Sequence, residues 1–349
     1  MHGEYKVPGG KLVGVDIVVH DDTITSAQVS GDFFLEPEEA LTRINLALEG
    51  LPTTARVSHI AHAVEEGLHG DDALIGFTTK AVGFAVRRAL GKATGWEDHV
   101  FELIEDGPRS PQMHMALDQV YAQALGEGTR GPTLRMWQWG APAVVLGSFQ
   151  SVANEVDLDG ARDHGMTVVR RISGGGAMFV EPGNTITYSL VVPGSLVDGL
   201  SFEESYEFLD QWVLAALGEL GIDARYAPLN DIVSPAGKIA GAAQKRLGDG
   251  TVLHHVTMAY DIDAAAMGQV LRIGKAKLVD KGVASANKRV DPLRSQTGMA
   301  RDEIVETMIE CFSRRYTLRR SSVTPAEEAA AQSLVKTKFS QREWTRRIP

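Results

Sequence analysis

The 349-residue sequence contains a single cysteine, Cys311, and no long hydrophobic run. One thiol cannot form an internal disulfide or supply a thiolate metal cluster within the chain. The longest apolar runs, such as 143–146 and 190–192, fall far short of the roughly 18 residues that a membrane span requires. We therefore predict a chain without disulfides and without a transmembrane segment.

Two further absences narrow the function. The N-terminal residues 1–6 lack the basic and apolar regions of a secretory signal, so we predict a cytoplasmic protein. The formal net charge of −10 argues against a general nucleic-acid binder, which needs a basic field to neutralise phosphates. Residues 314–349 are an exception to this negative charge, because they contain nine Lys and Arg residues but only three Glu residues.

Composition is that of an ordinary globular protein, with 44% hydrophobic and 23% charged residues, and the length allows two cores. The first ninety residues carry a complete pattern of their own. We predict strands over 12–19 and 23–34 with a turn at 20–22, followed by a helix after 36–39 and a second helix from 71 to 90. A short polar stretch, 91–95, then predicts a domain boundary near residue 93.

The remaining residues predict one larger domain that mixes helices and strands. Apolar spacing favours helices over 113–125, 202–220 and 304–316, and the last of these places Cys311 on a buried side as a structural thiol. Short β-branched runs favour strands. These runs cover residues 134–139, 143–149, 167–172, 185–192 and 256–260.

A glycine-rich segment follows one of these strands, in the sequence Arg170-Arg171-Ile172-Ser173-Gly174-Gly175-Gly176-Ala177-Met178-Phe179. Glycines allow the backbone to approach a ligand closely and to expose N–H groups to an anion, and an adjacent arginine can bind a phosphate or carboxylate. The alternative is an ordinary tight turn, since the segment matches neither the phosphate-loop nor the dinucleotide-binding pattern.

A second segment places Lys238 among small residues, from Gly237 to Gln244, shortly after Asn230-Asp231. An ammonium group on a flexible stem can reach into a narrow site where two anions must approach each other, such as a carboxylate and the α-phosphate of ATP. A solvent-exposed surface lysine is the alternative for Lys238 taken alone.

Together these segments resemble the lipoate-protein ligases. The resemblance covers most of residues 96–349 and includes 147–150, 183–185, 281–285, 339–344 and the pair His254-His255. Residues 5–13 and the hairpin after them look like the small accessory domain of that family, which many members carry at the C-terminus or as a separate chain. The resemblance implies an α+β fold, with an accessory domain at 1–92 and a large mixed-sheet catalytic domain of the biotin/lipoate protein ligase type at 93–349.

The family's reaction has two steps. A lipoate carboxylate attacks the α-phosphate of MgATP, and the lipoyl-AMP formed then acylates a lysine of a lipoyl domain. The resemblance implies lipoate as acyl substrate, with octanoate as the alternative, and lipoyl domains of 2-oxoacid dehydrogenase E2 subunits and the glycine cleavage H protein as acceptors. It makes Lys238 the catalytic cation and Asp231 the Mg²⁺ contact. Further ATP- or lipoyl-AMP-binding positions are Arg171, Ser173, Gly175, Gly176, Ala177, Met178, Phe179, Asn230, Asp231, Lys238 and His255.

Two features depart from simple expectations. Many family members have His-Asp after the aromatic residue of the glycine segment, whereas this chain has Val180-Glu181, which changes the polarity of the predicted pocket wall. The adjacent His254 and His255 do not predict a zinc site, because neighbouring residues in a strand point to opposite faces. For His255 a structural, hydrogen-bonded role stands beside the ligand-binding role.

Other functions remain open at this stage. An octanoyltransferase of the same fold uses a cysteine and no ATP, and a transferase route that uses Lys238 without a cysteine also stays open. A non-catalytic lipoate-binding protein would keep the pocket without turnover. A biotin ligase lacks support because its arginine-glycine phosphate loop is absent. We also hypothesise that the cationic region 314–349 helps to dock an acidic lipoyl domain, with solvated surface as the alternative.

Overall fold

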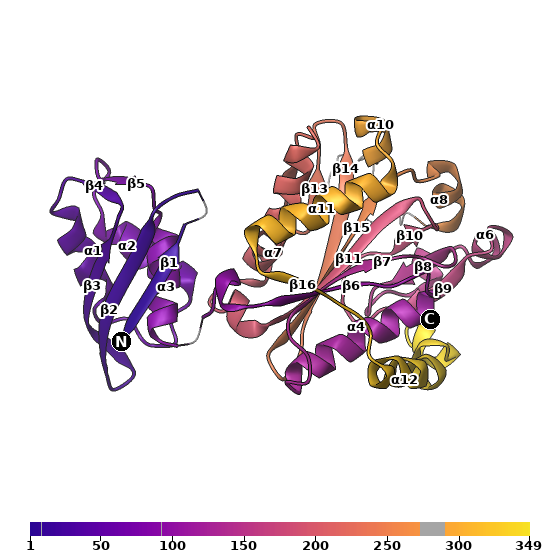
Figure 1. Cartoon of the computed structure of the whole chain (residues 1–349), viewed down its shortest axis with the longest axis horizontal. Helices are drawn as coiled ribbons and strands as arrows, with labels where there is room; N and C mark the ends of the chain where they lie inside the picture. The colour runs from indigo at the N-terminus through magenta and orange to yellow at the C-terminus, as the bar shows by residue number, and fades with distance from the viewer. Residues whose placement is uncertain (8, 92, 273–289) are drawn as a thin grey trace. The chain divides into compact units, whose positions relative to one another are not determined.

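The computed structural model describes residues 1–7, 9–91, 93–272 and 290–349. These residues form two compact units (Figure 1). The small unit comprises Met1–Asp98 and Gly194–Ser205, and the large unit comprises His99–Pro193 and Tyr206–Pro349. The division at 92/93 stays a prediction. The segment 281–285, which contributed to the family resemblance, lies outside the described residues.

The small unit packs three helices against an antiparallel sheet of order β1-β2-β3. Asp21 and Asp22 form the turn between β2 and β3 with positive φ angles of 47° and 57°, as a tight two-residue hairpin requires. The predicted turn at 20–22 is therefore confirmed. The elements are β1 His2–Lys6, β2 Leu12–His20, β3 Thr23–Gly31, β4 Phe34–Glu36, α1 Ala40–Leu48, α2 Val57–Gly67, β5 Ala73–Ile75 and α3 Thr79–Ala89.

The helix predicted from 71 to 90 begins later than expected. Residues Ala73–Ile75 instead form β5, which pairs with β4, and Gly76 then turns the chain with a φ angle of +86°. The Thr78 side chain accepts a hydrogen bond from the Ala81 N–H and so caps α3. The predicted strand 23–34 is also shorter, since β3 ends at Gly31.

A segment from the second half of the chain completes the small unit. Gly194–Ser205 follows a strand of the large unit but belongs to the small one. The Arg87 guanidinium is buried and its Nε donates to Asp198 at 2.8 Å. The Val57 N–H donates to the Gly199 carbonyl at 3.1 Å. The small unit therefore depends on residues outside the predicted range 1–92.

The large unit is built on an eight-stranded mixed sheet of order β12-β13-β14-β15-β11-β7-β6-β16 and a three-stranded sheet of order β10-β8-β9. Helices and strands mix as the α+β class requires, and the predicted fold class is confirmed. The strands are β6 Phe101–Glu105, β7 Thr133–Trp137, β8 Ala143–Leu146, β9 Thr167–Arg170, β10 Met178–Val180, β11 Thr185–Pro193, β12 Arg225–Ala227, β13 Asp231–Val233, β14 Lys238–Arg246, β15 Thr251–Ala259 and β16 Leu318–Ser321.

Helices cover both faces of the large sheet. On one face, α4 shares a buried core with both sheets, in which Leu117 packs with Trp137 of β7 and Val145 of β8. On the other face, Trp212 of α7 meets Tyr188 of β11, with ring centroids 4.9 Å apart. Figure 1 shows α11 across the upper half of this unit and α4 along its lower part. The helices are α4 Pro111–Gly126, α5 Val152–Glu155, α6 Leu158–Asp163, α7 Phe202–Glu219, α8 Ala264–Val270, α10 Leu293–Thr297, α11 Arg301–Arg315, α12 Pro325–Leu334 and α13 Arg342–Thr345.

The three helices predicted in this unit correspond to α4, α7 and α11, and Cys311 is buried as predicted. β14 was not predicted from the sequence, although it lies inside the sheet. Its segment is rich in Gly and Ala, which are depleted in strands. Among the described residues, no helix is both long enough and apolar enough to cross a membrane.

Candidate active site

The glycine-rich loop follows β9 and leads into β10, and Arg171 holds its shape. The Arg171 guanidinium donates through Nη2 to the carbonyls of Gly174 and Gly176 at 2.6 and 2.9 Å, and through Nε to Ser173 Oγ at 3.0 Å. Burial lowers the pKa of Arg171 to about 10, so the group is still charged at neutral pH. The arginine predicted to bind ligand is directed toward the loop carbonyls.

Because the carbonyls turn inward, the amide groups of the loop are left for another partner. Among the described residues, the N–H groups of Gly175 and Gly176 donate to no protein acceptor. Gly175 has a φ angle of +90°, and a Cβ at that position would lie 2.9 Å from Arg171 Nη2. A Cβ on Gly176 would meet no atom within 4 Å. Glycine at 175 is required by backbone conformation, and the loop presents unpaired donors suited to an anion.

Residues 177–179, at the end of the glycine-rich segment, line one cavity together with Lys238, although about sixty residues separate them in sequence. The cavity has a volume of about 200 Å³. Lys238 is the first residue of β14, and its side chain is 39% exposed. The lining is apolar except near the lysine. It consists of Ala177, Met178, Phe179, Lys238, Ile239, Ala240, Gly241, Thr257, Ala259, Ile262, Met267, Leu271 and Val290.

Asp231 is the ion-pair partner of Lys238, with 2.7 Å between Nζ and Oδ1. Asn230, beside it, has a different role, because its Nδ2 donates to the Ala242 carbonyl at 2.6 Å and fastens β13 to β14. A Mg²⁺ ion that arrives with ATP needs only one or two protein carboxylates and keeps several waters. The single carboxylate of Asp231 fits that demand, and it would then be shared between Lys238 and the ion.

The two adjacent histidines of β15 face opposite sides of the sheet, as predicted. His254 Nε2 lies 2.7 Å from Asp210 Oδ1 of α7. His255 faces α4 instead, with Nδ1 2.9 Å from Asp118 Oδ2 and Nε2 2.7 Å from Ser173 Oγ. Burial lowers the pKa of His255, and the Asp118 carboxylate opposes that shift. Ser173 and His255, both predicted site residues, therefore contact each other beneath the loop.

Asp118 is the functional candidate that the sequence reasoning missed. It lies in the middle of α4, it is buried, and it also accepts a hydrogen bond from Ser189 Oγ at 2.9 Å. Arg135 approaches the same carboxylate oxygen as Ser189, with 3.6 Å between Nη1 and Oδ1. A single acidic residue within the apolar helical pattern 113–125 was the available signal.

The residues that replace the family's His-Asp pair contribute no charge to the cavity. Val180 is fully buried in the core between the sheets, and Glu181 accepts a hydrogen bond from Asn184 Nδ2 at 3.2 Å in the turn before β11. Neither residue lines the cavity beside Lys238.

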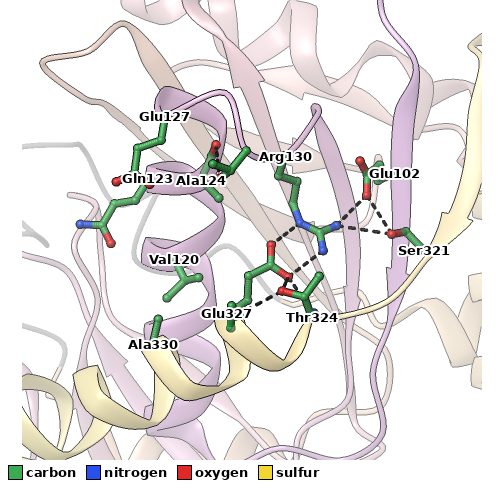
Figure 2. A pocket seen from close by; sticks show the side chains of 12 residues that line it. Glu102, Val120, Gln123, Ala124, Glu127, Arg130, Ser321, Thr324, Glu327 and Ala330 are labelled. Carbon is green, nitrogen blue, oxygen red and sulfur yellow. Dashed lines mark hydrogen bonds and ion pairs between the residues drawn. The ribbon is translucent and has the colours of Figure 1, made fainter.

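A second hollow, of about 630 Å³, lies between α4 and α12 (Figure 2). Its charged groups are bound to one another in a structural hydrogen-bond network. Figure 2 shows Arg130 between the carboxylates of Glu102 and Glu327, and the Nη1–Oε2 and Nη2–Oε2 distances are both 2.7 Å. Glu327 also accepts from the Thr324 N–H at 2.8 Å and completes the capping box of α12. We therefore assign this hollow to the attachment of α12 to the large unit.

This network gives a stability prediction. Arg130→Met is expected to lower the free energy of unfolding by about 3–5 kcal/mol, because it leaves the buried Glu327 without a counter-ion and Glu102 with only the exposed Arg319. Urea denaturation measures the change. Arg319→Met is the matched control, since Arg319 contacts the same Glu102 at 3.0 Å but is 66% exposed, and its expected cost is below about 1 kcal/mol. Equal costs for the two variants would contradict the assignment.

Comparison with known proteins decides the family. The model of the lipoyl protein ligase A/B catalytic domain matches residues 110–313, more than half of the chain. The chain belongs to this family. The octanoyltransferase LipM of Symbiobacterium thermophilum is 30% identical over 273 residues, which cover 71% of this chain and 98% of that protein. Lipoate-protein ligase A subunit 1 of Thermoplasma acidophilum is 28% identical, and the match covers 69% of this chain and 94% of that protein.

Solved structures of the lipoyl protein ligase family agree with this fold. The bipartite lipoate protein ligase of Thermoplasma acidophilum has a TM-score of 0.62 and 29% identity, and the match covers 72% of this chain and 97% of that one. A lipoate-protein ligase A bound with ATP has a TM-score of 0.61 and 27% identity, and the match covers 72% of this chain and 99% of that one. The relatives of this chain therefore include both lipoate-protein ligases and octanoyltransferases.

Proposed function

We propose that this protein is an ATP-dependent lipoate-protein ligase, which forms lipoyl-AMP and transfers the lipoyl group to the lysine of a lipoyl domain. One observation carries the choice of ligase over transferase. The only cysteine of the chain, Cys311, is fully buried in α11 and contacts the Trp212 carbonyl of α7, whereas the glycine loop lies toward α4. A cysteine-dependent transferase lacks its nucleophile at the cavity.

The first step fits the cavity. When a carboxylate attacks the α-phosphate, two anions approach and negative charge grows on the phosphoryl oxygens. Lys238 and the free N–H groups of Gly175 and Gly176 would stabilise that charge. When bound with ATP, Mg²⁺ would supply further neutralisation at the phosphates, with Asp231 as its protein contact. The ATP-bound relative supports the use of ATP.

The second step needs no enzyme nucleophile. The acceptor lysine must lose a proton and attack the activated carbonyl, and the AMP phosphate leaves with the electron pair. This step is mainly a matter of holding two reactants in line. We propose lipoate as acyl substrate, and lipoyl domains of 2-oxoacid dehydrogenase E2 subunits and the glycine cleavage H protein as acceptors.

Isotope exchange between pyrophosphate and ATP tests the proposal. A ligase is expected to catalyse exchange only when lipoate is present, because lipoyl-AMP formation is reversible. Transfer from octanoyl carrier protein without ATP, together with an absence of lipoate-dependent exchange, would establish the octanoyltransferase instead. A protein that binds lipoate but shows neither activity would be a non-catalytic binder.

The C-terminal cations give a place for the acceptor to dock. Arg314, Arg319 and Arg320 are neutralised by Glu219, Glu102 and Glu105, so the balance of region 314–349 overstates its free charge. Two of the later cations share one ring, since Lys338 Nζ and the Arg347 guanidinium lie 4.1 and 4.6 Å from the Trp344 centroid. Among the described residues of region 314–349, the cations without an ion pair are Arg315, Lys336, Lys338, Arg342, Arg346 and Arg347.

Burial and repulsion from nearby cations lower the pKa of one of these residues, Lys338. Burial, together with the charges of Lys245 and Arg347, lowers the pKa of Lys338 to about 8. A cationic patch of this kind on a protein of net charge −10 favours an acidic partner. We therefore assign residues 336–347 to the docking of an acidic lipoyl domain.

Charge reversal tests this surface. The double change Arg342→Glu with Arg346→Glu is expected to raise the KM for the acceptor domain several-fold and to weaken its salt dependence, while the KM for lipoate stays constant. Both arginines are exposed, whereas Arg347 donates to Ser148 and is unsuitable. Arg314→Glu on α11 is the control. An unchanged acceptor KM in the double variant would remove the docking role.

A further inference from the structure

Beneath the glycine loop, four side chains from the loop, β15 and α4 form one continuous hydrogen-bonded network. It runs from Arg171 through Ser173 and His255 to Asp118, with distances of 3.0, 2.7 and 2.9 Å. All four residues are buried. Ser189 Oγ, which accepts from Trp137 Nε1 at 3.0 Å, donates to the second oxygen of Asp118.

While His255 is neutral, the donors and acceptors of this network permit a single arrangement of hydrogen-bond directions. The Arg171 Nε–H can only donate, so Ser173 Oγ accepts from it and directs its own proton to His255 Nε2. The Asp118 carboxylate can only accept, so His255 carries its proton on Nδ1. The carboxylate on α4 thereby fixes the tautomer of a histidine on β15, and the histidine fixes the hydroxyl of Ser173.

We propose that Asp118 is a positioning residue, which acts through His255, Ser173 and Arg171 to hold the glycine loop in the conformation that binds the acyl-adenylate. This inference rests on the proposed function and deepens it. The consequence falls on the loop carbonyls, because Arg171 binds those of Gly174 and Gly176, while the N–H groups of Gly175 and Gly176 have no acceptor among the described residues.

This hydrogen-bonded network predicts that lipoate-dependent exchange falls on the acid side of its pH profile (the acid limb). Protonation of His255 at Nε2 removes the acceptor for Ser173, so the loop loses its support as pH falls through the pKa of His255. Burial places that pKa below the ordinary value of about 6.5. The other charged groups that face His255 or its partner are Arg171, which opposes protonation, Asp118, which favours it, Arg135 beside Asp118, and His254 on the same strand.

The test compares two buried aspartates that each pair with a histidine of β15. Asp118→Asn is expected to lower lipoate-dependent exchange on the order of 10²-fold on the plateau and to shift the acid limb to lower pH. The shift follows because the variant lacks the carboxylate that raises the pKa of His255. Asp210→Asn is the control, since Asp210 is equally buried but pairs with His254 on the opposite face. It is expected to change stability without moving the limb.

A second measurement does not depend on ligase activity. The ¹⁵N chemical shifts of His255, assigned by comparison with His255→Gln, are expected to show the neutral Nδ1–H tautomer at pH 7 in the wild type. In Asp118→Asn, amide hydrogen exchange is expected to accelerate at Ser148, whose N–H donates to the Ser173 carbonyl at 2.8 Å in the wild type. An Nε2–H or charged His255 in the wild type, or an Asp118→Asn variant with an unmoved limb and near-normal exchange activity, would overturn the proposal. A wild type with the Nδ1–H tautomer and no lipoate-dependent exchange would overturn the ligase function alone.

Discussion

Replacement of Lys238 by alanine is expected to lower lipoate-dependent ATP–pyrophosphate exchange by about 10²–10³-fold, because one preorganised cation at developing charge contributes roughly 3–4 kcal/mol. The fold is expected to remain. Lys238 is partly exposed and its ion pair with Asp231 lies at the cavity rim, where such pairs contribute about 0–1 kcal/mol. Thermal denaturation beside the exchange assay separates the two effects.

Two variants sharpen the Lys238 experiment. Lys238→Arg keeps the charge but replaces a compact ammonium with a planar fork, and we expect it to recover little activity. Lys245→Ala removes a lysine from the same strand, outside the cavity lining, and exchange is expected to stay near the wild-type rate. Near-normal exchange in Lys238→Ala would remove this lysine from the mechanism.

Replacement of Arg171 by methionine is expected to be almost as damaging, for a different reason. The guanidinium makes five hydrogen bonds, of which four go to the loop and one to the Val145 carbonyl. Without it, the loop carbonyls lose their donors and the amide groups lose their orientation. We expect exchange to fall by about 10²-fold. We also expect unfolding to become easier by about 1–3 kcal/mol, the typical cost of unsatisfied buried acceptors.

The variant Arg171→Lys distinguishes geometry from charge. A lysine keeps the positive charge but cannot reach Ser173, Gly174 and Gly176 together, so we expect a defect close to that of Arg171→Met. The affinity for a non-hydrolysable acyl-adenylate analogue, measured by calorimetry, should fall in parallel with exchange. Full activity in Arg171→Lys would show that only the charge matters.

Local patterns were sufficient for much of the fold. The hairpin turn at Asp21-Asp22 and the opposite orientation of His254 and His255 follow from backbone geometry that acts over a few residues. β14 was missed because its alanines and glycine have low strand propensity. What places this segment within the sheet is pairing with β13 and β15, which is a tertiary effect.

The candidate site was predictable in part for a similar reason. The motifs singled out the glycine-rich segment and Lys238, and residues 177–179 of that segment line one cavity with the lysine. They did not reveal that the Arg171 side chain is directed toward the loop carbonyls, since sequence does not tell which side of a strand end a long side chain occupies. Asp118 acts across 137 positions on His255, a distance at which no local pattern is informative.

The twelve residues that the second half of the chain lends to the small unit constrain how this architecture can be recombined. A gene fragment encoding only the first 98 residues would leave the buried Arg87 guanidinium without Asp198 and the start of α2 without the Gly199 carbonyl. Exchange of the N-terminal module between homologues would therefore require a matching graft of residues 194–205, which follow β11 and include the first turn of α7.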